Sequence, residues 1–162
     1  MATGERAAEA LWRFSLMLYG RPGMQDALIG LQDGGGHNVN LILFGLWLGL
    51  NGERLGAADL ARARAAIAKL DRGIVTPLRG LRRGLKGDPD PDVRDLRRRV
   101  LALELAAERR IQARLAGSFR QRRNAKTSNR AALAEANLCL VLGPDDFVSA
   151  EAAMIRKAIA DA

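Results

Sequence analysis

Cysteine, histidine and aromatic residues are scarce in this sequence, and each shortage narrows the range of functions. One cysteine among 162 residues excludes an internal disulfide and a cysteine metal motif. One histidine cannot supply the ligands of a histidine-based metal centre. Aromatic residues make up only 4% of the chain, so stacking on nucleic-acid bases has little support. We therefore expect no bound metal and no cofactor.

Long hydrophobic runs are also missing. The longest apolar run, Val39 to Leu50, is 12 residues long, whereas a membrane-spanning helix needs roughly 20. The first residues do not form a basic segment followed by an apolar one, as a secretory leader would. Cys139 lies among apolar residues and is interpreted as a small buried side chain. We expect a cytoplasmic protein without a transmembrane segment.

The residues that are abundant favour helix. Ala, Leu and Arg dominate, and no stretch alternates apolar and polar residues as a strand would. The pattern predicts an all-α fold, a single bundle of about six to seven helices over residues 1–162. The turn at residues 87–91 contains two prolines and is a possible point of subdivision.

Two helices are distinctive. Residues 39–50 follow Asn38, a good N-cap, and are apolar on nearly every side, which is typical of a helix at the centre of a bundle. A long helix is predicted from Pro91, with Asp90 as its cap. Before it, we expect a helix over 57–73 and a separate short basic helix over 78–86. The aromatic residues near the N-terminus are expected in the core: Trp12, Phe14, Tyr19, Phe44 and Trp47.

Positive charge is concentrated in one third of the chain. Residues 79–130 hold 16 Lys or Arg against 6 Asp or Glu, a net charge of +10, while the remainder has 10 against 12, a net of −2. Arginine suits an anionic partner because its planar group bonds two oxygens at once. The excess has a second explanation in compositional bias, since only four of the basic residues are lysine. The residues proposed to contact an acidic protein or a nucleic-acid backbone are Arg79, Arg82, Arg83, Lys86, Arg97 and Arg98.

Two glutamates fall near the apolar stripe of the long helix. Glu104 lies within the stripe and Glu108 at its border. A carboxylate removed from water needs a partner. A metal site would require more histidines, so we predict that at least one of the two contacts an arginine of the basic helix.

The glycine-rich segment at residues 32–40 is the second candidate site. Glycines that lead into a helix N-terminus can bind an anion, and His37 with Asp33 could act as base and orienting group. The segment matches neither the dinucleotide-binding nor the P-loop pattern. The simpler interpretation is a turn between helices, with Asn38 as the cap of the next helix. The candidate ligand-binding residues are Gln32, Asp33, His37 and Asn40.

Parts of the first half resemble a known family. The blocks are LWRFS at 11–15, LYGRPG at 18–23, LQD at 31–33, NVNLILF at 38–44 and VTPLRGLRRGLK at 75–86, with a looser match at 104–109. They are similar to an uncharacterised proteobacterial family of conserved hypothetical proteins, of the domain of unknown function 2390 type. This resemblance implies a helical bacterial domain and brings no catalytic residues with it.

The function is therefore open after the sequence alone. The first hypothesis is a helical interaction module, more plausibly not an enzyme, that binds an acidic or anionic partner through its arginines. The alternative is a protein or enzyme that binds a small molecule or phosphate at the glycine-rich turn. A third is self-association through an exposed apolar stripe on the long helix.

Overall fold

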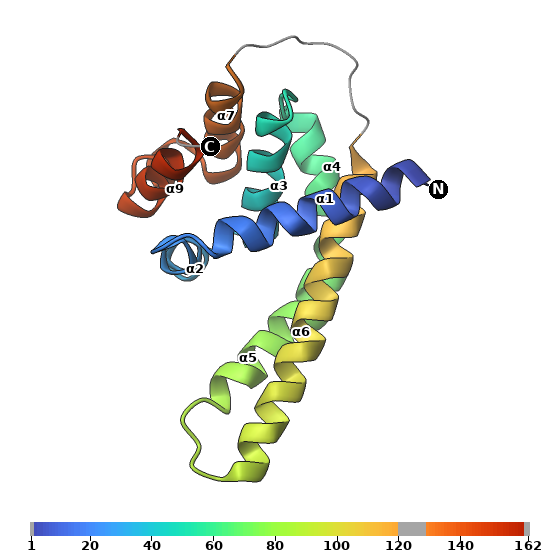
Figure 1. Ribbon diagram of the computed structural model, residues 1–162, viewed down its shortest axis with the longest axis vertical. Helices are drawn as coiled ribbons and strands as arrows, with labels where there is room; N and C mark the ends of the chain where they lie inside the picture. The colour runs from blue at the N-terminus through green and yellow to red at the C-terminus, as the bar shows by residue number, and fades with distance from the viewer. Residues whose placement is uncertain (1, 120–128, 161–162) are drawn as a thin grey trace.

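The computed structural model describes residues 2–119 and 129–160, and these form helices without any strand. Figure 1 shows their arrangement. The elements are α1 (Ala2–Tyr19), α2 (Met24–Gly35), α3 (Val39–Leu50), α4 (Ala57–Leu70), the π-helix η1 (Asp71–Val75), α5 (Thr76–Gly84), α6 (Pro91–Ser118), α7 (Arg130–Leu142), α8 (Pro144–Phe147) and α9 (Ala150–Ala160). The all-α prediction is confirmed, including the long helix that begins at residue 91.

Helix α3 is the centre of the bundle, as its composition predicts. Its N-cap is Asn38, whose side chain accepts hydrogen bonds from the backbone N–H groups of Asn40 and Leu41. Eleven of its 12 residues are buried. The core that surrounds it draws residues from α1, α2, α4, η1, α6, α7 and α9.

Helices α3 and α7 approach each other very closely. A Cβ atom added to Gly49 would overlap the backbone of Ala134, so only glycine fits there. Beside this contact, the fully buried Asn137 of α7 donates to the carbonyls of Gly45 and Glu53, both at 3.0 Å. These bonds connect α7 to α3 and to the loop that follows α3.

The break expected between residues 73 and 78 is not present. Helix α4 continues through η1 into α5, and the N–H of Thr76 bonds to the carbonyl of Asp71 in the wider spacing of a π-turn. Pro77 then occupies the first turn of α5, where its missing N–H is tolerated. The sequence interpretation was wrong here because a π-turn leaves no composition signal of its own.

Helix α5 and the first part of α6 form an arm. The arm, residues 76–99, extends away from the other helices (Figure 1), and none of its residues is buried. The long helix starts at the predicted cap, with Asp90 accepting from the N–H of Asp92 at 2.8 Å. No helix among the described residues is long and apolar enough to cross a membrane.

Candidate functional site

A cavity of about 280 Å³ opens where the arm meets the bundle. Five helices line it: α1, α2, α3, α5 and α6. In Figure 1, α1 runs across α3 and α6 where the arm meets the bundle, and α2 lies at the C-terminal end of α1. Both candidate sites of the sequence contribute to it, since the lining includes Gln32 and Asn40 as well as Arg79, Arg82 and Arg83.

Ion pairs between α5 and α6 form one side of the cavity. Arg79 Nε donates to Glu104 Oε1 at 3.2 Å, and Arg79 Nη2 donates to Glu108 Oε1 at 2.8 Å. Arg82 binds both oxygens of Glu104, with its Nε 2.5 Å from Oε2 and its Nη2 3.3 Å from Oε1. The side chain of Glu104 is only 4% exposed. The predicted contact between these glutamates and the basic helix is confirmed.

The two arginines reach Glu104 and Glu108 because each pair lies on one helix face. Arg79 and Arg82 are three residues apart, and Glu104 and Glu108 are four apart, so both pairs project from successive turns. The hydrogen bond that Arg82 donates to Glu104 raises the pKa of the Arg82 guanidinium, which therefore stays charged.

Glu108 and Tyr19 meet at the next part of the wall. Burial raises the pKa of the Glu108 carboxyl, while the nearby Arg79 opposes this change. Burial and the neighbouring Glu108 raise the pKa of Tyr19 to about 12, so its hydroxyl keeps its proton. This hydroxyl forms no hydrogen bond with any residue that the structure describes.

A chain of buried polar side chains continues from α1 through α6 to α3. Ser15 Oγ lies 3.2 Å from Gln112 Oε1, and Gln112 Nε2 donates to Asn40 Oδ1 at 3.0 Å. Asn40 is only 4% exposed. Its Nδ2 group has no acceptor within the described part of the chain and is not among the fully buried atoms that lack a partner, so it is accessible from the cavity that Asn40 lines.

The remaining wall is apolar. Its outer part consists of large side chains that are partly open to solvent: Leu16 at 54%, Ile29 at 37%, Leu101 at 36% and Leu105 at 44%. Trp12 and Tyr19 also line the cavity and are half-buried rather than part of the core, in contrast to the expectation from the sequence. Phe44 and Trp47 are buried as expected.

The four candidate residues of the glycine-rich turn do not lie together in the structure. Gln32 and Asn40 line the cavity, whereas Asp33 lies outside it and pairs with Arg83 at 2.8 Å. His37 points away toward α8, where its Nε2 lies 2.6 Å from Asp146 Oδ2. His37 and Asp33 are therefore not partners, and the pairing of base and orienting group suggested by the sequence is wrong.

The six arginine and lysine residues proposed for an anionic partner are also divided. Arg79, Arg82 and Arg83 have carboxylate partners, and Arg98 pairs with Asp95 at 2.6 Å. Only Lys86 and Arg97 form no ion pair within the described ranges. Further basic residues of the same third of the chain lie outside the described residues: Arg120, Arg122, Arg123 and Lys126.

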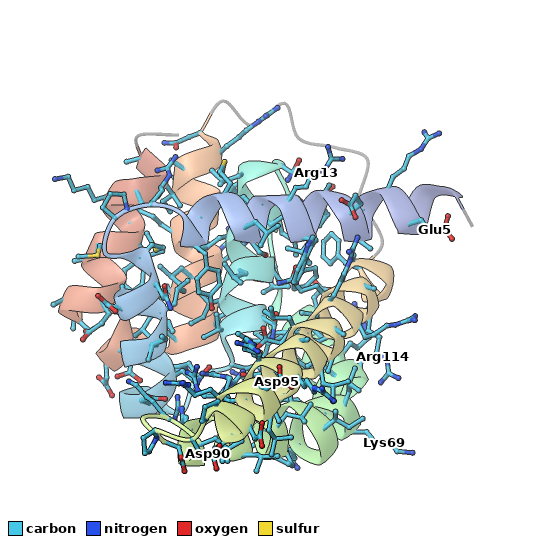
Figure 2. All side chains as sticks on the ribbon, turned by 60° about the horizontal axis from the view of Figure 1, so that its bottom comes forward. Glu5, Arg13, Lys69, Asp90, Asp95 and Arg114 are labelled. Atoms are coloured by element: carbon cyan, nitrogen blue, oxygen red, sulfur yellow. The ribbon has the colours of Figure 1, made fainter. Side chains whose placement is uncertain are left out.

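Several charged side chains elsewhere lie on the outer surface. Figure 2 shows Glu5 and Arg13 on α1, Lys69 on α4 and Arg114 on α6 pointing away from the packed faces. Among the described residues, no group of three or more His, Cys, Asp or Glu could hold a metal ion. Helix α6 also exposes Leu96 and Leu103 outside the cavity, so self-association stays a prediction.

Sequence reasoning missed the buried polar chain. Ser15 and Gln112 are 97 positions apart and belong to no motif. The available signal was weak: a glutamine within the apolar stripe of α6, next to Ile111.

No curated protein and no solved structure matches this chain. Residues 10–115 match the family described as protein of unknown function (DUF2390), a range that contains every residue lining the cavity. This match covers more than half of the sequence and confirms the resemblance of its first half, so the chain belongs to that family.

Proposed function

We propose that this protein binds a small organic molecule in the cavity between α1, α2, α3, α5 and α6. The observation that carries the proposal is the amide nitrogen of Asn40, a residue only 4% exposed, which donates to no described residue and lies in the wall of a cavity of about 280 Å³. Ligand sites typically combine apolar walls with a few converging polar groups, which is the composition of this cavity.

The volume supports a small ligand. A cavity of about 280 Å³ equals roughly nine water molecules at their volume in the liquid. Water alone would leave the exposed faces of Leu16 and Leu105 hydrated, whereas a ligand with an apolar part would cover them.

A binding role is favoured over catalysis. Glu104 and Glu108 both accept hydrogen bonds from arginines, and His37 lies on another side of the molecule. The groups that stay available, Asn40 and the hydroxyl of Tyr19, are suited to hold a ligand in place.

We also propose a cytoplasmic location, for which the single cysteine is the support.

The test is to fill the cavity and compare with a matched change outside it. Leu105→Trp adds bulk to the wall at a residue that is 44% exposed, and Leu103→Trp makes the same change on α6 outside the cavity, at 59% exposure. A fragment mixture is screened by saturation-transfer NMR against both variants and the parent protein. We expect fragments that bind the parent and Leu103→Trp but not Leu105→Trp. Equal binding to all three proteins would contradict the proposal.

A second candidate function rests on the end of the arm. Lys86, Arg94 and Arg97 line another cavity, of about 580 Å³, and Arg97 Nε is buried without a hydrogen-bond acceptor in the described chain. Lys86, Arg94 and Arg97 form no ion pair with a described residue, so they are available to bind an acidic protein or a nucleic-acid backbone.

Its test is binding of an RNA oligonucleotide and of an acidic peptide at two salt concentrations. The double change Lys86→Glu and Arg97→Glu should abolish binding. Lys69→Glu with Lys157→Glu is the control, because both lysines are exposed, lie on other helices and change the net charge equally. If both double variants lose affinity equally, the effect comes from net charge and the site is not at the arm.

A further inference from the structure

We propose that the ligand of the cavity is a small monocarboxylate with an apolar body, its carboxylate beside Asn40 and Tyr19 and its apolar part beneath Leu16, Ile29, Leu101 and Leu105. This inference rests on the proposed function and adds the chemical class of the ligand.

Several polar groups of the wall have unused donors, beside the amide side chains of Gln25 and Gln32, which can both donate and accept. Asn40 Nδ2 donates to no described residue, and neither does the Tyr19 hydroxyl. Arg79 and Arg82 use their Nε and Nη2 atoms on the glutamates, which leaves both Nη1 atoms available. A ligand that satisfies these groups must therefore present acceptor atoms, and a carboxylate has two oxygens for this purpose.

The charge of the wall favours a ligand with no more than one negative charge. Arg79 and Arg82 pair with Glu104 and Glu108, and Arg83 pairs with Asp33 on the outer side, so these ionised groups sum to zero. A phosphate dianion would add two uncompensated charges to a partly buried site, which costs more than the single charge of a carboxylate. A cation would have to displace an arginine from Glu104 or Glu108.

The apolar residues at the opening supply the other half of the recognition. Leu16, Ile29, Leu101 and Leu105 are each at least 36% exposed, although they are large hydrophobic residues gathered around one cavity. Covering them would remove apolar surface from water, which favours a ligand with a hydrocarbon or aryl body. Free phosphate or acetate would leave them uncovered.

The test uses four probes with one apolar body and different head groups: phenylacetate, benzylphosphonate, 2-phenylethanol and phenethylamine. Each is titrated into the full-length protein and followed through the indole N–H signals in NMR spectra. The chain has two tryptophans, Trp12 in the cavity wall and Trp47 in the core outside it, so the second is an internal control.

We expect phenylacetate to shift the Trp12 signal with the lowest Kd and to leave the Trp47 signal unchanged. If 2-phenylethanol, phenethylamine or benzylphosphonate binds as tightly or more tightly, the carboxylate class is wrong while the cavity remains a binding site. If none of the four shifts Trp12 and the fragment screen also fails, the proposed function fails with it.

Tyr19→Phe tests the placement of the carboxylate. It removes only a hydroxyl that has no described partner, so the stability of the free protein should not change. The affinity for phenylacetate should fall about tenfold, the size expected for one hydrogen bond to a charged group. The affinity for phenethylamine should not fall. An unchanged Kd for phenylacetate would show that its carboxylate lies elsewhere.

Asn40→Asp is the second variant. Its carboxylate can still accept from Gln112, as Asn40 does, but it replaces the free donor by a negative charge. Binding of phenylacetate should become undetectable, while 2-phenylethanol should still bind. If Asn40→Asp binds phenylacetate normally, Asn40 does not contact the carboxylate.

Discussion

Helices α3 and α5 are held in the molecule in opposite ways. Eleven of 12 residues of α3 are buried, whereas α5 has no buried residue. Helix α3 packs through apolar side chains and one close backbone contact at Gly49. Helix α5 is held against α6 largely by Arg79 and Arg82 on Glu104 and Glu108.

The difference explains where a ligand can be recognised. Apolar packing around α3 fills space and stabilises the fold, and α3 contributes to the site only near its N-terminus, where Asn40 lines the cavity. The interface of α5 and α6 with α1 has polar groups, some of which lack partners, beside an open volume. Four predictions test this division between packed centre and polar wall.

The largest effect should come from the close contact of α3 with α7. Gly49→Ala places a methyl group against the backbone of Ala134, which cannot rotate away as a side chain could. We expect a loss of about 3 kcal/mol in the free energy of unfolding, measured in urea.

Gly80→Ala in α5 is the control for this change, because nothing lies within 4 Å of the added Cβ. Alanine should stabilise that helix by about 0.5–1 kcal/mol. Similar losses at both positions would mean that the contact at Gly49 is not special and would remove the contrast between the two helices.

The second effect concerns the ion pairs of the arm. Glu104→Gln keeps the shape but removes the charge that faces Arg79 and Arg82, so we expect a loss of about 2 kcal/mol. Hydrogen exchange should locate the loss in α5 rather than in α3. Glu9→Gln is the control, since its pair with Arg109 is exposed and should contribute under about 0.5 kcal/mol. A uniform loss of protection from hydrogen exchange in all helices would contradict the idea that these ion pairs stabilise the arm alone.

The third prediction is a dependence on pH. Burial raises the pKa of Glu108, so the folded state holds its proton more strongly than the unfolded state does. Its contribution to stability is therefore complete below its ordinary pKa and is lost as the pH rises through the folded pKa. Glu108→Gln should become more stable relative to the parent protein as the pH is raised from 4 toward 7. A difference that shrinks over this range would mean that Arg79 outweighs burial.

The smallest effect is expected for the ionisation of the Tyr19 hydroxyl, which takes place only at alkaline pH. Tyr19 is the only tyrosine, so absorbance at alkaline pH reports on this residue alone. Its midpoint should lie at about 12 in the folded protein. In urea it should return to about 10. A folded midpoint near 10 would show that the hydroxyl is open to water and that the cavity wall is less enclosed at this point.

Much of the secondary structure could be predicted from the sequence because it depends on neighbours along the chain. Asn38 and Asp90 cap α3 and α6 as their positions predicted. A single domain with a possible division at residues 87–91 stays a prediction. Limited proteolysis at that turn would examine it.

The site could be predicted only in fragments. The contact between Glu104 or Glu108 and the basic helix could be predicted because burying an unpaired carboxylate costs free energy. The arginines of the basic helix were the expected partners. That Gln32 and Asn40 share a cavity with these arginines, while His37 turns to Asp146, did not follow from spacing.

By itself, the sequence determined the all-helical class, the caps, the buried centre at α3 and the family. These depend on periodicity and on residues a few positions apart. Only the tertiary structure decided that α4, η1 and α5 are continuous, that four of the five candidate arginines are paired with carboxylates, and that Asn40 has an unused donor in a cavity wall. The physical reason is that a cavity is bounded by side chains distant along the chain, and their meeting depends on how whole helices pack.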